Sequence, residues 1–269
     1  MAGTTRATRR SVAKRHDEIL AVLKSEGSMS VIDLAKRLGR SAATIRRDLQ
    51  DLQETSGIRR YHGAVAVEAL AMEGAFQERL AEADQEKRSI AGAVVSQLQP
   101  GQVIGLNGGT TTTQIARHIA ETGINLTVVT NAVNIAFELT ASKIAVVVVG
   151  GVLQAANYET TGPLALRVLA NLHLDWAILG ANGLDQRFGA STHTESEASV
   201  GQAFAAQADR VVLAVDHSKL AKTALFRMVE WEKVYGVACD HQGAELLSTW
   251  GMESPTIRVA DGGFWLVRR

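Results

Sequence analysis

The chain has 269 residues, of which 46% are hydrophobic, so it is long enough for two domains and too apolar to be disordered as a whole. Its net charge is zero, yet residues 1–60 carry 13 Lys and Arg against 7 Asp and Glu, a basic head suited to a polyanion such as nucleic acid. The single cysteine, Cys239, excludes an internal disulfide, and no apolar run reaches the roughly 20 residues of a membrane span, so we expect a soluble, cytoplasmic protein.

The first elements are predicted from hydrophobic periodicity. Residues 1–13 are small, polar and basic, which predicts a disordered arm. Helices are expected over residues 14–24, 31–38 and 42–55, because apolar side chains recur there every three or four positions. Ser41 precedes the third helix and is a natural N-cap, since its hydroxyl can accept a hydrogen bond from a backbone N–H of the first turn.

The second and third helices are joined by a tight turn at Gly39, and the third helix carries two adjacent arginines on its outer face. Such a pair is typical of the helix-turn-helix that reads DNA. A short hairpin over residues 57–67 completes a winged helix over residues 14–68, and its wing adds contacts to the DNA backbone. The residues that we expect to contact DNA are Ser41, Thr44, Arg46, Arg47, Gln50, Arg59, Arg60 and His62.

Residues 69–88 are polar and charged, which predicts a linker, and residues 89–269 follow a different pattern. Short, β-branched apolar runs alternate there with helical patterns, and strands that are buried on both faces read as such runs. This alternation predicts an α/β domain with a mostly parallel sheet. The expected strands cover residues 103–106, 126–129, 144–149, 176–179, 211–215 and 233–238.

Small and polar residues follow five of these strands, and parallel sheets bind ligands at the carboxyl ends of their strands. After the first strand, glycines and threonines lead into a helix whose N-terminal amides can hold a phosphate, although the same residues also suit an ordinary strand-to-helix turn. We expect a small, phosphorylated, hydroxyl-rich ligand. Its expected contacts are Asn107, Gly108, Gly109, Thr110, Thr111, Thr112, Asn131, Gly150, Gly151, Gly180, Asn182, Glu195 and Lys219.

Other kinds of site lack their spacing in this sequence. The glycines match neither the loop of nucleotide-hydrolysing proteins nor the motif of dinucleotide sites. The histidines are dispersed without metal-ligand spacing, and no nucleophile can be placed beside a base. We therefore expect no metal, no cofactor and no catalytic residues.

In this order, the segments resemble the DeoR family of bacterial sugar-responsive repressors over roughly residues 14–265. The resemblance rests on Ser41-x-x-Thr44-Ile45-Arg46-Arg47-Asp48-Leu49, Arg60-x-His62-Gly63, Phe76-x-x-Arg79, Glu86-Lys87, Gly108-Gly109-Thr110-Thr111, Val129-Thr130-Asn131, Gly150-Gly151, Gly180-Ala181-Asn182-Gly183-Leu184-Asp185 and Asp216-x-Ser218-Lys219. It implies a winged helix on operator DNA, a sensor domain related to ribose-5-phosphate isomerase, and a homo-oligomer, a dimer or a tetramer. Two departures are Asn107, where the family usually has aspartate, and Ala64, where it usually has glycine.

The rival hypothesis is a sugar-phosphate isomerase with a fused DNA-binding head. The related isomerases carry acids where this chain has Leu179 and Asn182, and neither residue can transfer the proton that isomerisation requires. A DNA-binding structural protein without a ligand would leave the glycines at the strand ends unexplained. We therefore predict a repressor of a carbohydrate-utilisation operon, not an enzyme, that a phosphorylated sugar releases from DNA.

Overall fold

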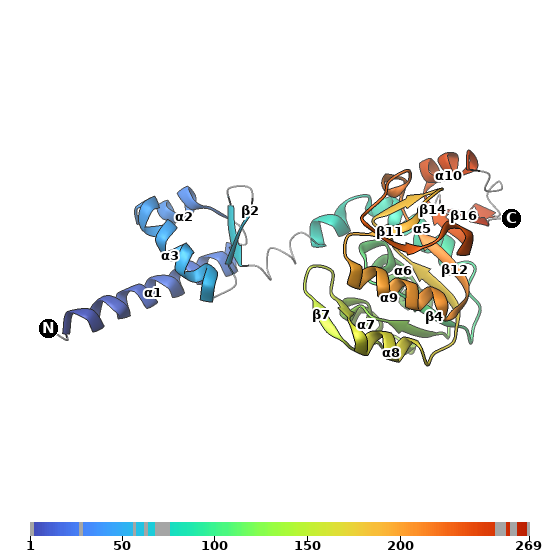
Figure 1. Cartoon of the computed structure of the whole chain (residues 1–269), viewed down its shortest axis with the longest axis horizontal. Coiled ribbons are helices and arrows are strands. Elements are labelled where there is room, and N and C mark those ends of the chain that lie inside the picture. The colour runs from blue at the N-terminus through green and yellow to red at the C-terminus, as the bar shows by residue number, and fades with distance from the viewer. Residues whose placement is uncertain are drawn as a thin grey trace. The chain divides into compact units, whose positions relative to one another are not determined.

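The computed structural model describes residues 3–26, 29–55, 58–61, 64–67, 76–250, 257–258 and 263–267. The chain divides into two compact units, Met1–Glu78 and Arg79–Arg269, whose elements can be followed in Figure 1. No helix among these residues is long and apolar enough to cross a membrane.

The N-terminal unit is a winged helix, as predicted. Its core brings together seven apolar side chains of the three helices: Ile19, Leu23, Leu34, Ala35, Ile45, Leu49 and Leu52. A three-stranded sheet in the order β1-β3-β2 forms the wing. The elements are α1 (Gly3–Glu26), β1 (Met29–Ser30), α2 (Val31–Arg37), α3 (Ala42–Thr55), β2 (Ile58–Tyr61) and β3 (Ala64–Val67).

The start of the chain differs from the prediction. A disordered arm was expected over residues 1–13, whereas α1 already begins at Gly3. The stretch is rich in Ala and Arg, which favour helix, and contains no proline to end it. Polar composition alone therefore did not predict the conformation of this segment.

The C-terminal unit is built on an eight-stranded sheet in the order β15-β16-β14-β12-β9-β4-β5-β6. The six strands from β14 to β6 are parallel, and they fall on the six predicted apolar runs. Among the described strands of this sheet, β16 alone runs in the opposite direction, paired antiparallel with β14 and β15, so the prediction of a mostly parallel sheet is confirmed. The strands are β4 (Val103–Leu106), β5 (Thr127–Thr130), β6 (Ala145–Val148), β9 (Leu174–Leu179), β12 (Ala208–Ala214), β14 (Val234–Cys239), β15 (Ile257–Arg258) and β16 (Phe264–Val267).

Helices cover both faces of this sheet. One core cluster packs α5, α6 and α7 on the sheet through residues such as Ile90, Ile115 and Ile135. The other packs α8, α9 and α10 on it through residues such as Leu169 and Phe204. These helices are α5 (Asp84–Val95), α6 (Thr110–Thr122), α7 (Val133–Leu139), α8 (Pro163–Leu169), α9 (Glu195–Ala206) and α10 (His241–Ser248).

Short elements that were not predicted from the sequence lie in the connections between the strands of the large sheet. The β7–β8 hairpin follows β6, and a small antiparallel sheet in the order β10-β11-β13 begins just after β9. Strands of three or four residues are too short to show a clear periodicity. They are β7 (Val152–Gln154), β8 (Glu159–Thr161), β10 (Gly183–Asp185), β11 (Gly189–Thr192) and β13 (Phe226–Val229), with two 3-10 turns, η1 (His217–Lys219) and η2 (Trp231–Lys233).

The predicted linker over residues 69–88 is too long. Residues 76–81 are helical, and α5 begins at Asp84, so only the earlier part of the range is left for a linker. The prediction took charged residues as exposed linker residues. Lys87 is instead buried in α5, where its ammonium group donates hydrogen bonds to the backbone carbonyls of Arg79 and Glu82.

Candidate DNA-binding surface and candidate effector site

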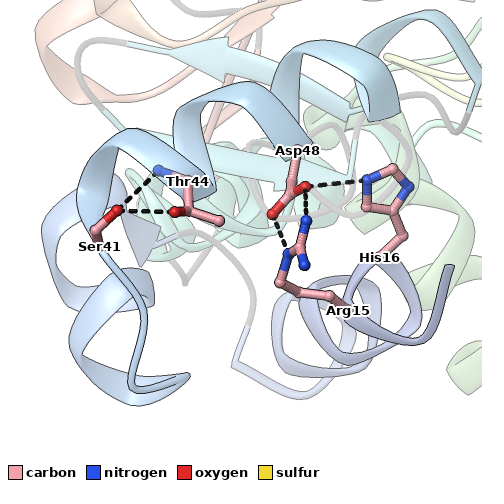
Figure 2. Close-up of polar contacts among 5 residues, drawn as sticks. All are labelled: Arg15, His16, Ser41, Thr44 and Asp48. Carbon is pink, nitrogen blue, oxygen red and sulfur yellow. Dashed lines mark hydrogen bonds and ion pairs between the residues drawn. The ribbon is translucent and has the colours of Figure 1, made fainter. Parts of the chain in front are cut away.

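The recognition helix α3 starts on a cap made by two hydroxyl residues. The backbone N–H of Thr44 donates to Ser41 Oγ at 3.1 Å, and the hydroxyl oxygens of Ser41 and Thr44 lie 2.8 Å apart (Figure 2). This cap satisfies an N–H of the first turn and fixes where the helix begins. Further along, the predicted DNA contacts Arg46, Arg47 and Gln50 are all exposed.

Asp48 holds the opposite side of α3. It is buried, and its carboxylate accepts hydrogen bonds from Arg15 Nε at 2.5 Å and Nη2 at 2.6 Å (Figure 2). His16 Nε2 lies 3.4 Å from the same carboxylate, an ion-pair distance. Burial by itself would raise the pKa of Asp48, but Arg15 outweighs it and holds that pKa below its usual value. Asp48 therefore braces α3 against α1, which leaves the two neighbouring arginines to face outward.

The predicted wing contacts lie on β2 or beside it. Arg59 and Arg60 pair through the backbone with Ala66 and Val65 of β3. Their side chains lie outside what the structure describes, as does the whole of His62. Their contacts with DNA stay predictions.

The candidate effector site lies where the order of the sheet reverses. The chain passes from β4 to β5 on one side and later returns to β9 on the other side of β4. Ligands of open α/β sheets bind at such a switch point, outside the carboxyl ends of the strands. There Asn107 Nδ2 donates to the carbonyl of Gly180 at 3.1 Å, and the N–H of Gly180 donates to Asn107 Oδ1 at 2.8 Å.

The N-terminus of α6 opens at the same place. Its N-cap, Gly109, has φ +147°, a conformation that favours glycine, and it offers no side-chain cap to the first turn. The hydroxyls of Thr112 and Thr113 donate back to the Gly109 carbonyl at 3.1 and 2.7 Å, which tightens the turn. Uncapped first-turn amides of a helix are suited to an anion such as phosphate.

A network of acidic and amide side chains lies beside this helix start. Asn157 Nδ2 donates to Glu159 Oε2 at 2.9 Å and to Glu197 Oε1 at 2.6 Å. The hydroxyl of Thr192 is within hydrogen-bonding distance of the Glu197 carboxylate and lies 2.7 Å from Asn182 Oδ1. Five side chains from three separate segments thus present oxygen and nitrogen atoms that can bind the hydroxyls of a ligand.

Glu159 is the unusual member of this network. Burial, and next the charge of Glu197, raise the pKa of Glu159 to about 8, although the backbone N–H of Gly108 and the amide of Asn157 partly oppose the rise. The contact with Gly108 is close, because a Cβ at that position would lie 2.2 Å from Glu159 Cγ. A perturbed carboxyl at such a position is a candidate functional group.

Cationic side chains lie in the turn that follows β12 and on α5. Asp216 Oδ1 accepts the N–H of Ser218 at 2.9 Å and so starts the turn that carries Lys219. The neighbouring His217 shares a hydrogen bond of 2.5 Å with Asp240, which raises the pKa of His217. Burial lowers the pKa of Lys87. The charge of Asp216 opposes this shift, and the charge of Lys219 adds to it.

The predicted effector residues therefore have different surroundings. Asn107, Gly108, Gly109 and Thr110–Thr112 line the switch point together with Gly180, and Asn182 joins the acidic network. The buried Asn131 bonds to the backbone of Thr160, and Gly151 packs so closely on Thr161 that a Cβ would lie 2.5 Å from its carbonyl oxygen. Asn131 and Gly151 thus shape the hairpin that carries Glu159, and Gly150 lies exposed before it.

Sequence reasoning selected Glu195, but the structure places it exposed at the start of α9 and puts Glu197 into the network instead. The side chains that were missed are Lys87, Asn157, Glu159, Thr192, Glu197 and His217. One signal was present in the sequence, since Thr194 and Glu197 have the spacing of an N-cap and its third helical residue, which fixes the start of α9.

A winged helix joined to an α/β domain with a polar site at its switch point defines a ligand-responsive DNA-binding regulator. Residues 15–69 match the DeoR-like helix-turn-helix domain, and residues 82–241 match the DeoR C terminal sensor domain. The chain belongs to the DeoR family of transcriptional regulators.

Curated relatives agree with this assignment along most of the chain. The HTH-type transcriptional regulator GlpR of Haloferax volcanii is 34% identical over 82% of this chain and 87% of its own length. The glycerol-3-phosphate regulon repressor of Escherichia coli K12 is 30% identical over 84% and 90%. Among solved structures, ribose 5-phosphate isomerase A from Methanocaldococcus jannaschii aligns with 69% of this chain and 79% of its own at 18% identity, with a TM-score of 0.40.

Proposed function

We propose that this protein represses a carbohydrate-utilisation operon and leaves its operator when a phosphorylated sugar binds. The proposal is supported by similarity to a glycerol-3-phosphate regulon repressor and to a putative aga operon repressor, the latter 30% identical over 92% of this chain. The observation that carries it is the convergence, at one switch point, of an uncapped helix start with a network of hydroxyl-binding side chains.

The phosphate of the effector binds the first-turn amides of α6, assisted by Lys219. The sugar hydroxyls bind Glu197, Asn157 and Asn182, whose oxygen and nitrogen atoms already form one network. Charge-assisted hydrogen bonds of this kind are short and directional, so they distinguish sugars by the placement of their hydroxyls. The effector shifts the relative position of two heads in a dimer or tetramer, and an allosteric coupling of about 1–3 kcal/mol would lower operator affinity.

The test measures both ligands on the same protein. Operator binding is followed by fluorescence anisotropy with a duplex from the protein's own promoter, and effector binding by thermal shift against a panel of pentose, hexose and triose phosphates. Arg46→Ala should weaken DNA binding and leave the thermal shift intact. Lys219→Ala should reduce the thermal shift and leave DNA binding without effector intact. Lys233→Ala, an exposed cation at the amino end of β14, is the matched control.

An isomerase activity is the alternative, and Glu159 is the observation in its favour. A carboxyl with a pKa of about 8 beside a second carboxylate is the kind of group that transfers protons at neutral pH. We propose binding without turnover, because Leu179 and Asn182 offer no base at the end of β9. Steady isomerisation of a sugar phosphate that Glu159→Gln abolishes would establish the enzyme instead.

A further inference from the structure

Exposed apolar side chains gather at one edge of the sensor unit. Two helices each present a pair spaced by four residues, Val133 with Phe137 on α7 and Leu164 with Val168 on α8, so each pair lies on one helical face. Phe137 is 76% exposed. The apolar edge surface, as we name it, consists of Val133, Phe137, Val147, Val148, Val152, Leu153, Leu164 and Val168.

The elements that carry these residues are neighbours around the edge of the sheet. Helix α7 packs against β6, the β7–β8 hairpin follows β6 directly in the chain, and α8 packs against β8. Figure 1 shows α7, α8 and β7 at the same end of the sensor unit.

The centre of this surface is the open edge of the sheet. Within the described residues β6 pairs only with β5, and its sequence is Ala145-Val146-Val147-Val148. Natural proteins protect an edge strand with lysine, proline, a bulge or a covering element, because unpaired backbone groups recruit another strand. Strand β6 has no such residue within it, and Val147 and Val148 are both exposed although neighbours in a strand point to opposite faces.

We propose that a second copy of this chain binds here, with β6 of each subunit paired antiparallel across a two-fold axis. The same strand set against itself satisfies both rows of free N–H and C=O groups, and the same apolar residues meet on both sides, as an isologous interface requires. A strand of another protein would have to match this pattern by chance, whereas a copy matches it by symmetry.

The extent of the surface agrees with a stable dimer. A fully exposed residue of this size presents about 150–200 Å², so the eight residues leave on the order of 700 Å² uncovered. That exceeds the roughly 300–600 Å² of the largest apolar patch on a typical monomer. It approaches the roughly 800 Å² that each partner buries in a standard interface.

The interface adjoins the candidate effector site through one hairpin. Val152 and Leu153 lie on the exposed β7 strand, and their backbone partners Thr161 and Thr160 are adjacent to Glu159 on β8. A ligand that moves Glu159 therefore moves part of the subunit contact. This link rests on the proposed function, whereas the interface itself does not.

The experiment compares the mass of the full chain in solution across three single variants, by light scattering after gel filtration at micromolar concentration. Val148→Lys places a charge on the open strand, and Phe137→Glu places one on α7 without touching the core. Leu225→Glu is the matched control, since Leu225 is also 76% exposed but lies outside the apolar edge surface. Circular dichroism checks that each variant is folded.

We expect a dimer or tetramer for the wild type and the control, and a halved mass for Val148→Lys and Phe137→Glu. A tetramer that falls to dimers also supports the proposal. A monomeric wild type, unchanged masses in both edge variants, or equal dissociation of the control would overturn it. So would hydrogen exchange in which the β6 amides are protected to the same degree in a monomeric Phe137→Glu variant as in the wild type, because another part of the same chain would then cover the edge.

The two proposals fail in different ways. A monomeric edge variant should still show the thermal shift with a sugar phosphate, because the switch-point residues are unchanged. Its operator affinity should fall at least tenfold, since each half-site is then bound separately. Loss of the thermal shift in the wild type would refute the effector and leave the interface standing.

Discussion

The N-terminal unit buries Asp48 beside a cation, whereas the sensor unit buries Glu159 beside a second carboxylate. Asp48 keeps its charge because Arg15 binds it through two hydrogen bonds. Among the described residues, Glu159 has only amide donors and no cation beside it, so burial and the charge of Glu197 raise its pKa and favour the protonated form. The ion pair of Asp48 holds α3 in one orientation. The carboxyl of Glu159, in contrast, can gain or lose a proton when its surroundings change.

The two units also assemble their functional residues differently. The helix contacts expected for DNA come from residues 41–50, one continuous segment. The candidate effector site draws on residues 107–112, 157–159, 180–182, 192–197 and 216–219, which are far apart in the sequence. Substitutions should therefore have local, separable effects in the first unit and coupled effects in the second.

The largest expected effect is that of Asp48→Ala. Removing the acid leaves Arg15 without its partner and removes the polar link between α3 and α1, so the N-terminal unit should lose about 3–4 kcal/mol of unfolding free energy. Chemical denaturation followed by circular dichroism should show an earlier first transition, and operator binding should be lost. The thermal shift with the effector should survive. A wild-type first transition would show that the brace contributes little.

Gly108→Ala tests how closely the sensor site is built. The new Cβ would lie 2.2 Å from Glu159 Cγ, so the hairpin must shift, at a cost of about 2–3 kcal/mol typical of overpacking. We expect the effector-induced thermal shift to disappear while DNA binding without effector is retained. Gly150→Ala is the control, because a Cβ there meets nothing within 4 Å. Equal effects of both substitutions would argue against a specific clash.

Glu159→Gln tests the protonated carboxyl. Its pKa is about 8 in the folded protein and near 4.5 when unfolded, so the folded state holds a proton that the unfolded state releases between these values. Its contribution to stability is thus present below about pH 4.5 and lost as pH rises to 8. The amide cannot ionise and should raise sensor-unit stability by about 1–3 kcal/mol at pH 8 and little at pH 4.5. Thermal melts across this range should show it, with the exposed Glu195→Gln unchanged.

Ser41→Ala should have the smallest effect. It removes the N-cap of α3 and should cost about 1 kcal/mol of stability in the N-terminal unit. Operator affinity should fall less than in Arg46→Ala, because a direct phosphate or base contact is worth about 1–3 kcal/mol. If Ser41→Ala matched or exceeded Arg46→Ala in anisotropy titrations, Ser41 itself would contact DNA.

The sequence predicted what depends on neighbouring residues. Periodicity placed α3 at Ala42–Thr55 and its cap at Ser41, and unbroken apolar runs placed the six parallel strands. The alternation of strands and helices predicted a mostly parallel sheet, but it did not predict the order of the strands.

Long-range pairing lay beyond the sequence. The spacing of Thr194 and Glu197 indicates where α9 begins, but nothing local shows that Glu197 joins the acidic network while Glu195 stays exposed. Lys87 was predicted to lie in a linker. A lysine can be buried only where acceptors surround its ammonium group, and here the folded backbone supplies them as carbonyls. Asp48 read as part of a DNA motif, and only its partner 33 residues away shows that it is a brace.

The reciprocal bond between Asn107 and Gly180 explains why an amide suits this position. Its oxygen accepts from the N–H of Gly180 and its nitrogen donates to the carbonyl of the same residue, which an aspartate could not do with both. The ends of β4 and β9 are thereby clamped together by protein atoms alone. Because this backbone arrangement is already formed, a ligand that binds there would not have to order it, so we expect discrimination among ligands to come from the side chains around it.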